Sequence, residues 1–216
     1  MASKKVLFTR PQHDDVTNYL SSWCEEVIIF AHDNNIQVKD LGAENVTREN
    51  FEKFIVGQDP KLVIINGHGE EDCIFGHKNE VLVKKGVNDN ILRGRIVYAV
   101  SCDSAYELGP SAVDKGAIAY IGYDSPFGFL TNKNKECTPE DDELANNFKE
   151  PSNVVPLSLL KGNSVGASYE KSQNRFKDLI KKFTNSHTLL EAKDIRFWLF
   201  WDMKAQKLLG SPESNF

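Results

Sequence analysis

Apolar segments and segments with helical spacing alternate through the first two thirds of the chain. Most of the apolar segments are short and continuous, as is typical of strands buried on both faces. They cover residues 5–9, 36–41, 61–66, 95–102 and 117–123. Helical spacing or helix-start signals cover residues 14–35, 47–57, 89–94 and 104–116, the last bent near Gly109-Pro110. Asp14 or Asp15 and Thr47 are suitable N-caps for the first two helices.

This alternation predicts a mostly parallel central sheet with helices on both faces, a three-layer α/β/α arrangement. Residues 73–83 have the pattern of a small hairpin. The C-terminal third is helical by period, in segments 142–150, 155–162, 164–183 and 190–209, and residues 196–201 are expected to be mostly core. We expect one domain over residues 1–216, with the polar, turn-rich residues 125–143 as a mobile loop.

Composition narrows the classes of function. The 216 residues are 40% hydrophobic and 26% charged, as expected of an ordinary globular protein, and the net charge of −5 argues against binding a nucleic-acid backbone. No apolar run is long enough for a membrane helix, and the N-terminal residues do not have the pattern of a secretory signal. The four cysteines lack metal-site spacing, so we expect free thiols in the cytoplasm.

Two residues with chemical potential follow two of the predicted strands. His68 follows the strand at 61–66, and Cys102 ends the strand at 95–102. Ligands bind beyond the carboxyl ends of parallel strands, so neighbouring strands would place both side chains on one rim. An imidazole beside a thiol is the minimal apparatus of a cysteine nucleophile. The backbone amides of Gly69 and Cys102 could form an oxyanion hole. Taken singly, such a cysteine is usually a small buried hydrophobe, and such a His-Gly is usually a turn.

Longer stretches around these residues resemble a known group of proteins. Residues 68–86, "HGEEDCIFGHKNEVLVKKG", and residues 96–105, "IVYAVSCDSA", resemble the histidine and cysteine regions of caspases. The order of elements is similar to that of the wider cysteine-peptidase clan of caspases, metacaspases, gingipains, clostripain, separase and CHAT domains. "GAIAYIGY", residues 116–123, and the late "KLLGSP" look closer to gingipains and CHAT domains. The resemblance implies a caspase-hemoglobinase fold, a His68/Cys102 dyad, and an oxyanion hole at Gly69 and Cys102 without metal or cofactor.

The chain also departs from the caspase pattern. Cys102 follows His68 by 34 residues (102 − 68), where caspases have about 50. The Gln-Ala-Cys-x-Gly signature is absent, so cleavage after aspartate does not carry over. Three charged residues are candidates for a substrate pocket, each beside a plainer role. Asp103 could line the pocket or cap the next helix, and Asp124 could bind a basic side chain or start a turn. Arg10 could bind an acidic substrate or pair with a carboxylate.

We therefore expect a regulated cysteine endopeptidase of narrow specificity. It would act on a protein substrate and answer to a regulatory protein partner, with neither nucleic acid nor membrane involved. The alternative is a catalytically silent scaffold of the same fold that binds a protein partner. A flavodoxin-like nucleotide-binding domain is a weaker alternative, because "FTRPQHDD" after the first strand contains no glycine for a phosphate loop.

Overall fold

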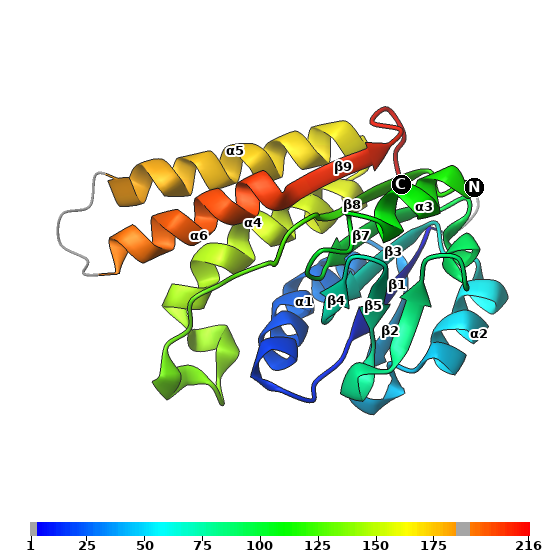
Figure 1. The fold of residues 1–216 in the computed structure, drawn as a ribbon, viewed down its shortest axis with the longest axis horizontal. Helices are drawn as coiled ribbons and strands as arrows, with labels where there is room; N and C mark the ends of the chain where they lie inside the picture. Colours follow the sequence, from blue (N-terminus) through cyan, green and yellow to red (C-terminus); the bar gives the residue numbers. More distant parts are fainter. Residues whose placement is uncertain (1–3, 185–190) are drawn as a thin grey trace.

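The protein is built around a six-stranded sheet, seen in a computed structural model that describes residues 4–184 and 191–216 (Figure 1). The strands lie in the order β2-β1-β3-β7-β8-β9. The first five pair in parallel, and β9 pairs antiparallel with β8. Their bounds are β1 Lys5–Arg10, β2 Gln37–Gly42, β3 Leu62–Asn66, β7 Ile96–Val100, β8 Ala119–Tyr123 and β9 Gln206–Gly210. The predicted mostly parallel sheet is thus confirmed.

Helices cover both faces of this sheet. One face carries α1 (Asp15–Asp33), α4 (Glu143–Leu160), α5 (Val165–Thr184) and α6 (Ala192–Ala205), whose buried side chains form one core with the strands. In Figure 1, α5 and α6 run beside one another over α4. The other face carries α2 (Arg48–Gln58) and α3 (Leu108–Asp114) over a second core. The three-layer architecture is therefore as predicted.

The strands alternate between these two cores. In β1, Val6 and Phe8 face the core under α1, while Leu7 faces the core under α2. Successive side chains of a strand point to opposite faces, so a strand covered on both sides must be apolar at every position. This explains why β1, β3, β7 and β8 are continuous apolar runs in the sequence.

A small three-stranded sheet follows β3. It contains β4 (Gly69–Glu70), β5 (Cys73–Phe75) and β6 (Val81–Lys84), in antiparallel order β4-β5-β6. The predicted hairpin at 73–83 is therefore present, with the 3-10 turn His77–Asn79 at its tip. Two further 3-10 turns, Ala43–Asn45 and Asp89–Leu92, connect the elements of this half. The small sheet packs its buried side chains, Ile74, Leu82 and Val83, into the core under α2.

Several predicted helices differ from the structure. The helix predicted at 89–94 is the short 3-10 turn Asp89–Leu92. Helix α3 begins only at Leu108, so Gly109-Pro110 lie in its first turn, where proline is tolerated, and do not bend it. Helix α4 is continuous through Pro151 and Pro156, where two helices were predicted. Pro156 cannot donate to the carbonyl of Ser152, and the buried Tyr98 hydroxyl donates to that oxygen instead, at 2.8 Å.

The C-terminal segment also differs. The predicted helix at 190–209 starts with Leu190, which lies outside the described residues, and its last part is the edge strand β9. Of residues 196–201, only Leu199 is fully buried, and Phe197, Phe200 and Trp201 are exposed, so the prediction of a mostly core segment was wrong. None of the helices in the described ranges has the length and apolarity needed to cross a membrane.

Residues 125–143 connect the carboxyl end of β8 to α4. The segment contains two 3-10 turns, Lys133–Lys135 and Pro139–Asp141. Phe127 and Phe129 pack against aromatic rings of the core, with Phe129 centred 4.9 Å from Trp23 and Phe127 4.7 Å from Tyr123. The mobility of this loop stays a prediction, but its aromatic side chains are anchored beside the sheet.

Candidate active site

Strands β3 and β7 bring the two predicted residues to the same edge. The strands are neighbours, with Asn66 opposite Val100 at their carboxyl ends. The amide of Gly67 then donates to the carbonyl of Val100 across 3.3 Å. His68 and Cys102 each follow two residues after this last pair, so both loops leave the sheet side by side. The register therefore supports the expectation of one shared rim.

Gly69 lies directly against the cysteine loop. A Cβ placed on Gly69 would come within 2.6 Å of the carbonyl oxygen of Cys102 and 3.0 Å of the Ser101 Cβ. The first distance is shorter than any real Cβ contact, so the two loops could not approach this closely with a larger residue. The sequence suggested that glycine leaves room for a substrate carbonyl. The structure adds a different reason, which is room for the backbone of Cys102.

Cys102 is partly buried beside the 125–143 loop. Its Sγ lies 3.9 Å from the carbonyl oxygen of Phe127. Burial, reinforced by the carboxylates of Asp103 and Asp202, raises the pKa of the thiol above its ordinary value. The resting residue is therefore a thiol at neutral pH. Its backbone N–H donates to no backbone carbonyl within residues 4–184 and 191–216, so it is available to a ligand.

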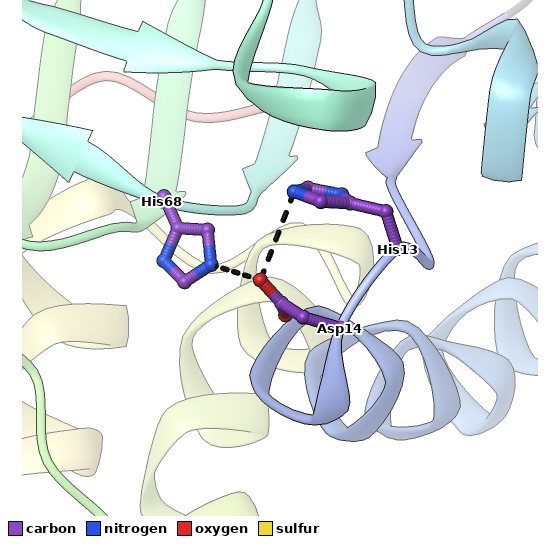
Figure 2. Close-up of side chains that lie close together, drawn as sticks. All are labelled: His13, Asp14 and His68. Atoms are coloured by element: carbon purple, nitrogen blue, oxygen red, sulfur yellow. Dashed lines mark hydrogen bonds and ion pairs between the residues drawn. The ribbon is translucent and has the colours of Figure 1, made fainter.

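His68 makes a short hydrogen bond to a residue that the sequence did not connect with it. Its Nε2 lies 2.6 Å from Oδ2 of Asp14. Figure 2 shows this contact as a dashed line. Asp14 is the N-cap of α1: its Oδ1 accepts from the amide and the hydroxyl of Thr17, both at 2.8 Å. One carboxylate thus caps a helix with one oxygen and holds His68 with the other.

The charge on Asp14 decides the state of the His68 ring. Partial burial alone would raise the pKa of this carboxyl, but the hydrogen bonds from Thr17 and His68 outweigh it and lower the pKa to about 2. Asp14 is therefore ionised at neutral pH and can only accept. Nε2 of His68 must then carry a proton, so the neutral form of the ring has its lone pair on Nδ1. Asp14 thus fixes which nitrogen of the neutral ring can act as a base.

Two further histidines extend the cluster. The ring of His13 is centred 5.9 Å from His68 and 5.4 Å from His77, edge to face in both cases. Nε2 of His13 lies 3.7 Å from the same oxygen of Asp14, and Figure 2 shows both rings converging on that carboxylate. The sequence gave no reason to connect His13 or Asp14 with this rim, beyond their position just after β1, whose carboxyl end shares the edge.

Acidic side chains line a pocket that begins at Asp103, next to the cysteine. The pocket has a volume of about 500 Å³ and is bordered by five carboxylates: Glu70, Glu71, Asp72, Asp103 and Glu107. Lysines neutralise part of this charge, through Lys84 on Asp72 at 2.9 Å and Lys85 on Glu107 at 3.1 Å. Asp103 does not cap α3, which starts at Leu108, and its backbone is left-handed with φ of 58°.

The other two pocket candidates are engaged elsewhere. Arg10 donates from Nε and Nη2 to the carboxylate of Asp40, at 2.6 to 3.0 Å, and also pairs with Glu25. This is the carboxylate pairing that the sequence left open as one of two roles. Asp124 pairs with Lys207 of β9 at 3.2 Å, and its amide donates to the carbonyl of Ala205. Arg10 and Asp124 therefore form ion pairs with neighbouring strands, β2 and β9, and these pairs account for their charges.

No protein-family model and no curated protein matches this sequence, but solved structures share its fold. The chain is similar to the Arg-specific cysteine proteinase gingipain R, RgpB, over 98% of its length, with a TM-score of 0.58 and 11% identity. It is likewise similar to the complex of the pro- and mature domains of RgpB from Porphyromonas gingivalis, over 97% of its length, with a TM-score of 0.57 and 11% identity.

The match covers 47% of each gingipain chain, so the protein spans about half the length of these neighbours. At 11% identity, the likeness concerns the fold alone. The predicted caspase-hemoglobinase fold is thereby confirmed, and the structures that share it include gingipains, which the sequence resemblance had named.

Proposed function

We propose that the protein is a cysteine endopeptidase in which Cys102 is the nucleophile, His68 the acid and base, and Asp14 the residue that orients His68. The observation that carries this proposal is the 2.6 Å contact between Asp14 and His68. The loop that carries His68 packs, at Gly69, against the backbone of Cys102. A nucleophile, a base and a third group that fixes the base recur in cysteine and serine peptidases of unrelated folds.

Each step of the reaction uses these groups. Nδ1 of His68 takes the proton from Sγ of Cys102, and the thiolate attacks the carbonyl carbon of the scissile peptide. The backbone N–H of Cys102, with that of Gly69, stabilises the oxyanion. The imidazolium, stabilised by Asp14, gives its proton to the leaving amine, and an acyl-enzyme remains. His68 then activates a water that hydrolyses the thioester and restores the thiol.

The raised pKa of Cys102 supports the need for this base. A buried thiol beside Asp103 and Asp202 does not ionise by itself at neutral pH. The Cys102 thiol must therefore lose its proton to His68 when the substrate binds, because no thiolate is present beforehand. The lone pair on Nδ1 that Asp14 enforces provides the acceptor.

The acidic pocket supports a preference for basic substrates. Glu70, Glu71 and Asp103 border it without a lysine or arginine partner among the described residues. A lysine or arginine side chain of a bound peptide would find complementary charge there. Gingipain R is named Arg-specific, and we carry a basic preference to this chain as part of the proposal. A substrate with acidic residues at these positions would be repelled.

A protein partner is part of the same proposal. One of the two similar structures is a complex between pro- and mature domains of RgpB. By analogy, we infer that a regulatory protein or segment covers the rim of this enzyme until it is needed. The silent-scaffold alternative makes the same prediction for binding but none for cleavage, so the two are separated by catalysis.

The test is labelling with a peptide that carries a cysteine-reactive group and a basic residue before it. We expect one adduct, on Cys102, and cleavage of the matching fluorogenic peptide. Both disappear in Cys102→Ala and persist in Cys137→Ala, because Cys137 is an exposed thiol with no part in the proposed reaction. An adduct on Cys137 alone, or cleavage that survives Cys102→Ala, would overturn the proposal. Partner binding without any cleavage by the parent protein would favour the scaffold.

A further inference from the structure

The geometry points to a second use of the His68 rim: His13, Asp14 and His68 form a binding site for a zinc-like divalent metal ion, which switches the dyad off when bound. The binding site itself stands on the three side chains alone. Its inhibitory effect rests on the proposed peptidase function.

The ligand atoms already lie near the positions that zinc requires. Oδ2 of Asp14 is 2.6 Å from Nε2 of His68 and 3.7 Å from Nε2 of His13, and the three ligand atoms lie within 4.8 Å of one another. Ligands at ~2.0–2.1 Å from a tetrahedral zinc ion are about 3.3 Å apart, so small side-chain rotations suffice. Two imidazoles and a carboxylate suit zinc better than calcium or magnesium, which prefer oxygen ligands.

The burial of His13 is a separate observation in favour of a ligand. Its side chain is only 10% exposed, so the ring is packed in place at the rim rather than free in solvent. Its Nε2 faces the Asp14 oxygen and the amide oxygen of the exposed Asn79, at 3.2 Å. An imidazole aimed in this way at a carboxylate shared with His68 is what a metal site needs.

The proposed metal site is open to solvent. The side chains of Asp14 and His68 are 40% and 33% exposed, so an ion can enter from solvent. Three protein ligands leave the fourth zinc position for a water molecule. The charge also agrees, because the ionised carboxylate of Asp14 offsets half the charge of the divalent ion.

Metal binding and catalysis compete for the same nitrogen. In the metal-free protein, Nε2 of His68 carries the proton and Nδ1 is the base. A metal ion on Nε2 displaces that proton, and the neutral ring then carries its proton on Nδ1. The proton has moved from one ring nitrogen to the other, and Nδ1 can no longer accept from Cys102. The ion also replaces the hydrogen bond between His68 and Asp14. The dyad therefore loses both its acceptor nitrogen and the carboxylate that orients the ring.

The test uses the full chain as Cys102→Ala, which removes the nearby thiol as a ligand and any peptidase activity. Zn²⁺ is titrated in competition with a zinc-binding dye, and Co²⁺ absorption reports the ligand geometry. We expect one ion per chain, and binding at least tenfold weaker when His13→Gln or His68→Ala is added. The matched control His32→Ala removes an exposed histidine in the last turn of α1 and should bind as before. Circular dichroism confirms folding of each variant.

A second measurement tests the switch in the protein with Cys102 intact. Zn²⁺ should inhibit peptide cleavage, and His13→Gln should raise the inhibitory concentration at least tenfold relative to its own uninhibited rate. Equal binding by the His13 variant would overturn the site. So would loss of binding on Asp72→Asn, since Glu70, Asp72 and Cys73 form the other possible cluster in the described chain. Binding that depends on His13 without any peptide cleavage would leave the metal site standing and refute the peptidase.

Discussion

Oδ2 of Asp14 accepts a hydrogen bond from Nε2 of His68 across 2.6 Å, although the two residues are 54 positions apart. The contact exists because β1 and β3 are adjacent parallel strands, so the loops that follow them meet at one sheet edge. Thr17 holds the other carboxylate oxygen and fixes the rotation of Asp14. The helix cap is therefore also the support of the proposed catalytic base, which couples the fold of α1 to the chemistry.

Asp14→Asn separates these two roles. Asparagine caps helices as well as aspartate, so we expect the free energy of unfolding to change by less than about 1 kcal/mol. Its side chain cannot enforce the Nε2-protonated ring or stabilise the imidazolium, so kcat/KM should fall by about 10²- to 10⁴-fold. Peptide cleavage and thermal unfolding of the same preparations measure both effects.

The control for this prediction is Asp15→Asn, which changes an exposed acid in the first turn of α1. It should leave kcat/KM within about twofold, since removing a charge at a helix N-terminus alters stability by only ~0.3–1 kcal/mol. Equal activity losses for the two variants would mean that charge near the rim matters, and not the contact with His68.

Gly69→Ala tests the packing of the two loops that carry His68 and Cys102. The added methyl would lie 2.6 Å from the Cys102 carbonyl, so one loop must move. We expect destabilisation of about 1–3 kcal/mol, as for other overpacked sites, together with a large loss of kcat. Gly57→Ala is the matched control, because it lies in α2 with no atom within 4 Å of the new methyl. That change should stabilise the protein by about 0.5–1 kcal/mol, since alanine favours helices. Urea unfolding and peptide cleavage measure the two effects. A Gly69→Ala variant with the stability and kcat of the parent would mean that the two loops are not in this close contact.

Asp89 makes stability depend on acid. It is fully buried, and Lys115 and Ser111 both donate to it at 2.6 Å, tying the turn at 89–92 to α3. Burial alone would raise its pKa, but these hydrogen bonds outweigh it and lower the pKa below the ordinary value. The unfolded chain therefore binds the proton more tightly, and the contribution to stability, complete above about pH 4, is lost as the pH falls further.

Urea unfolding between pH 3 and pH 7 checks this. Asp89→Asn should lower the free energy of unfolding at pH 7 by about 1–3 kcal/mol and flatten its decline below pH 4. Asp59→Asn is the comparison, because Asp59 pairs with Arg95 while 85% exposed, and should change stability by less than about 1 kcal/mol. An unchanged acid slope in Asp89→Asn would assign the acid sensitivity to other carboxyl groups.

Local pattern was enough to predict the sheet, the small hairpin and the two strand ends that deliver His68 and Cys102. It worked because strands covered on both faces leave continuous apolar runs, and because chemistry concentrates at their carboxyl ends. The role of Asp14 escaped prediction, since its local environment as an N-cap already explains it. Only the order of β1 beside β3 brings it to His68, and strand order is not written in any single segment.

Two other misses have the same origin. Residues 206–210 continue the helical spacing of α6, yet they pair with β8 and complete the sheet, a nonlocal gain that overrides periodicity. The prolines of α4 suggested a break, but the carbonyl freed by Pro156 is satisfied by Tyr98 of β7. In both cases a hydrogen bond to a distant strand decides the local structure.

Asp202 should lower the free energy of unfolding as the pH rises. This residue of α6 is fully buried, its Oδ1 accepts the amide of Gly128 at 3.0 Å, and its Oδ2 has no partner in the described ranges. Burial raises its pKa well above the ordinary value. The folded protein thus holds a proton that the unfolded chain releases above about pH 4, so stability declines as the pH rises through the raised pKa.

Asp202→Asn removes this titration while an amide oxygen still accepts from Gly128. We expect the variant to be more stable than the parent at pH 8, with the difference vanishing near pH 4, in urea unfolding at both pH values. Because Asp202 is also one of the carboxylates that raise the pKa of Cys102, alkylation of the thiol should reach half its maximal rate at a lower pH. Asp194→Asn, exposed on the same helix, should leave both profiles unchanged. A lower stability of Asp202→Asn at pH 8 would show that the ionised carboxylate is needed to hold residues 126–130 beside the cysteine.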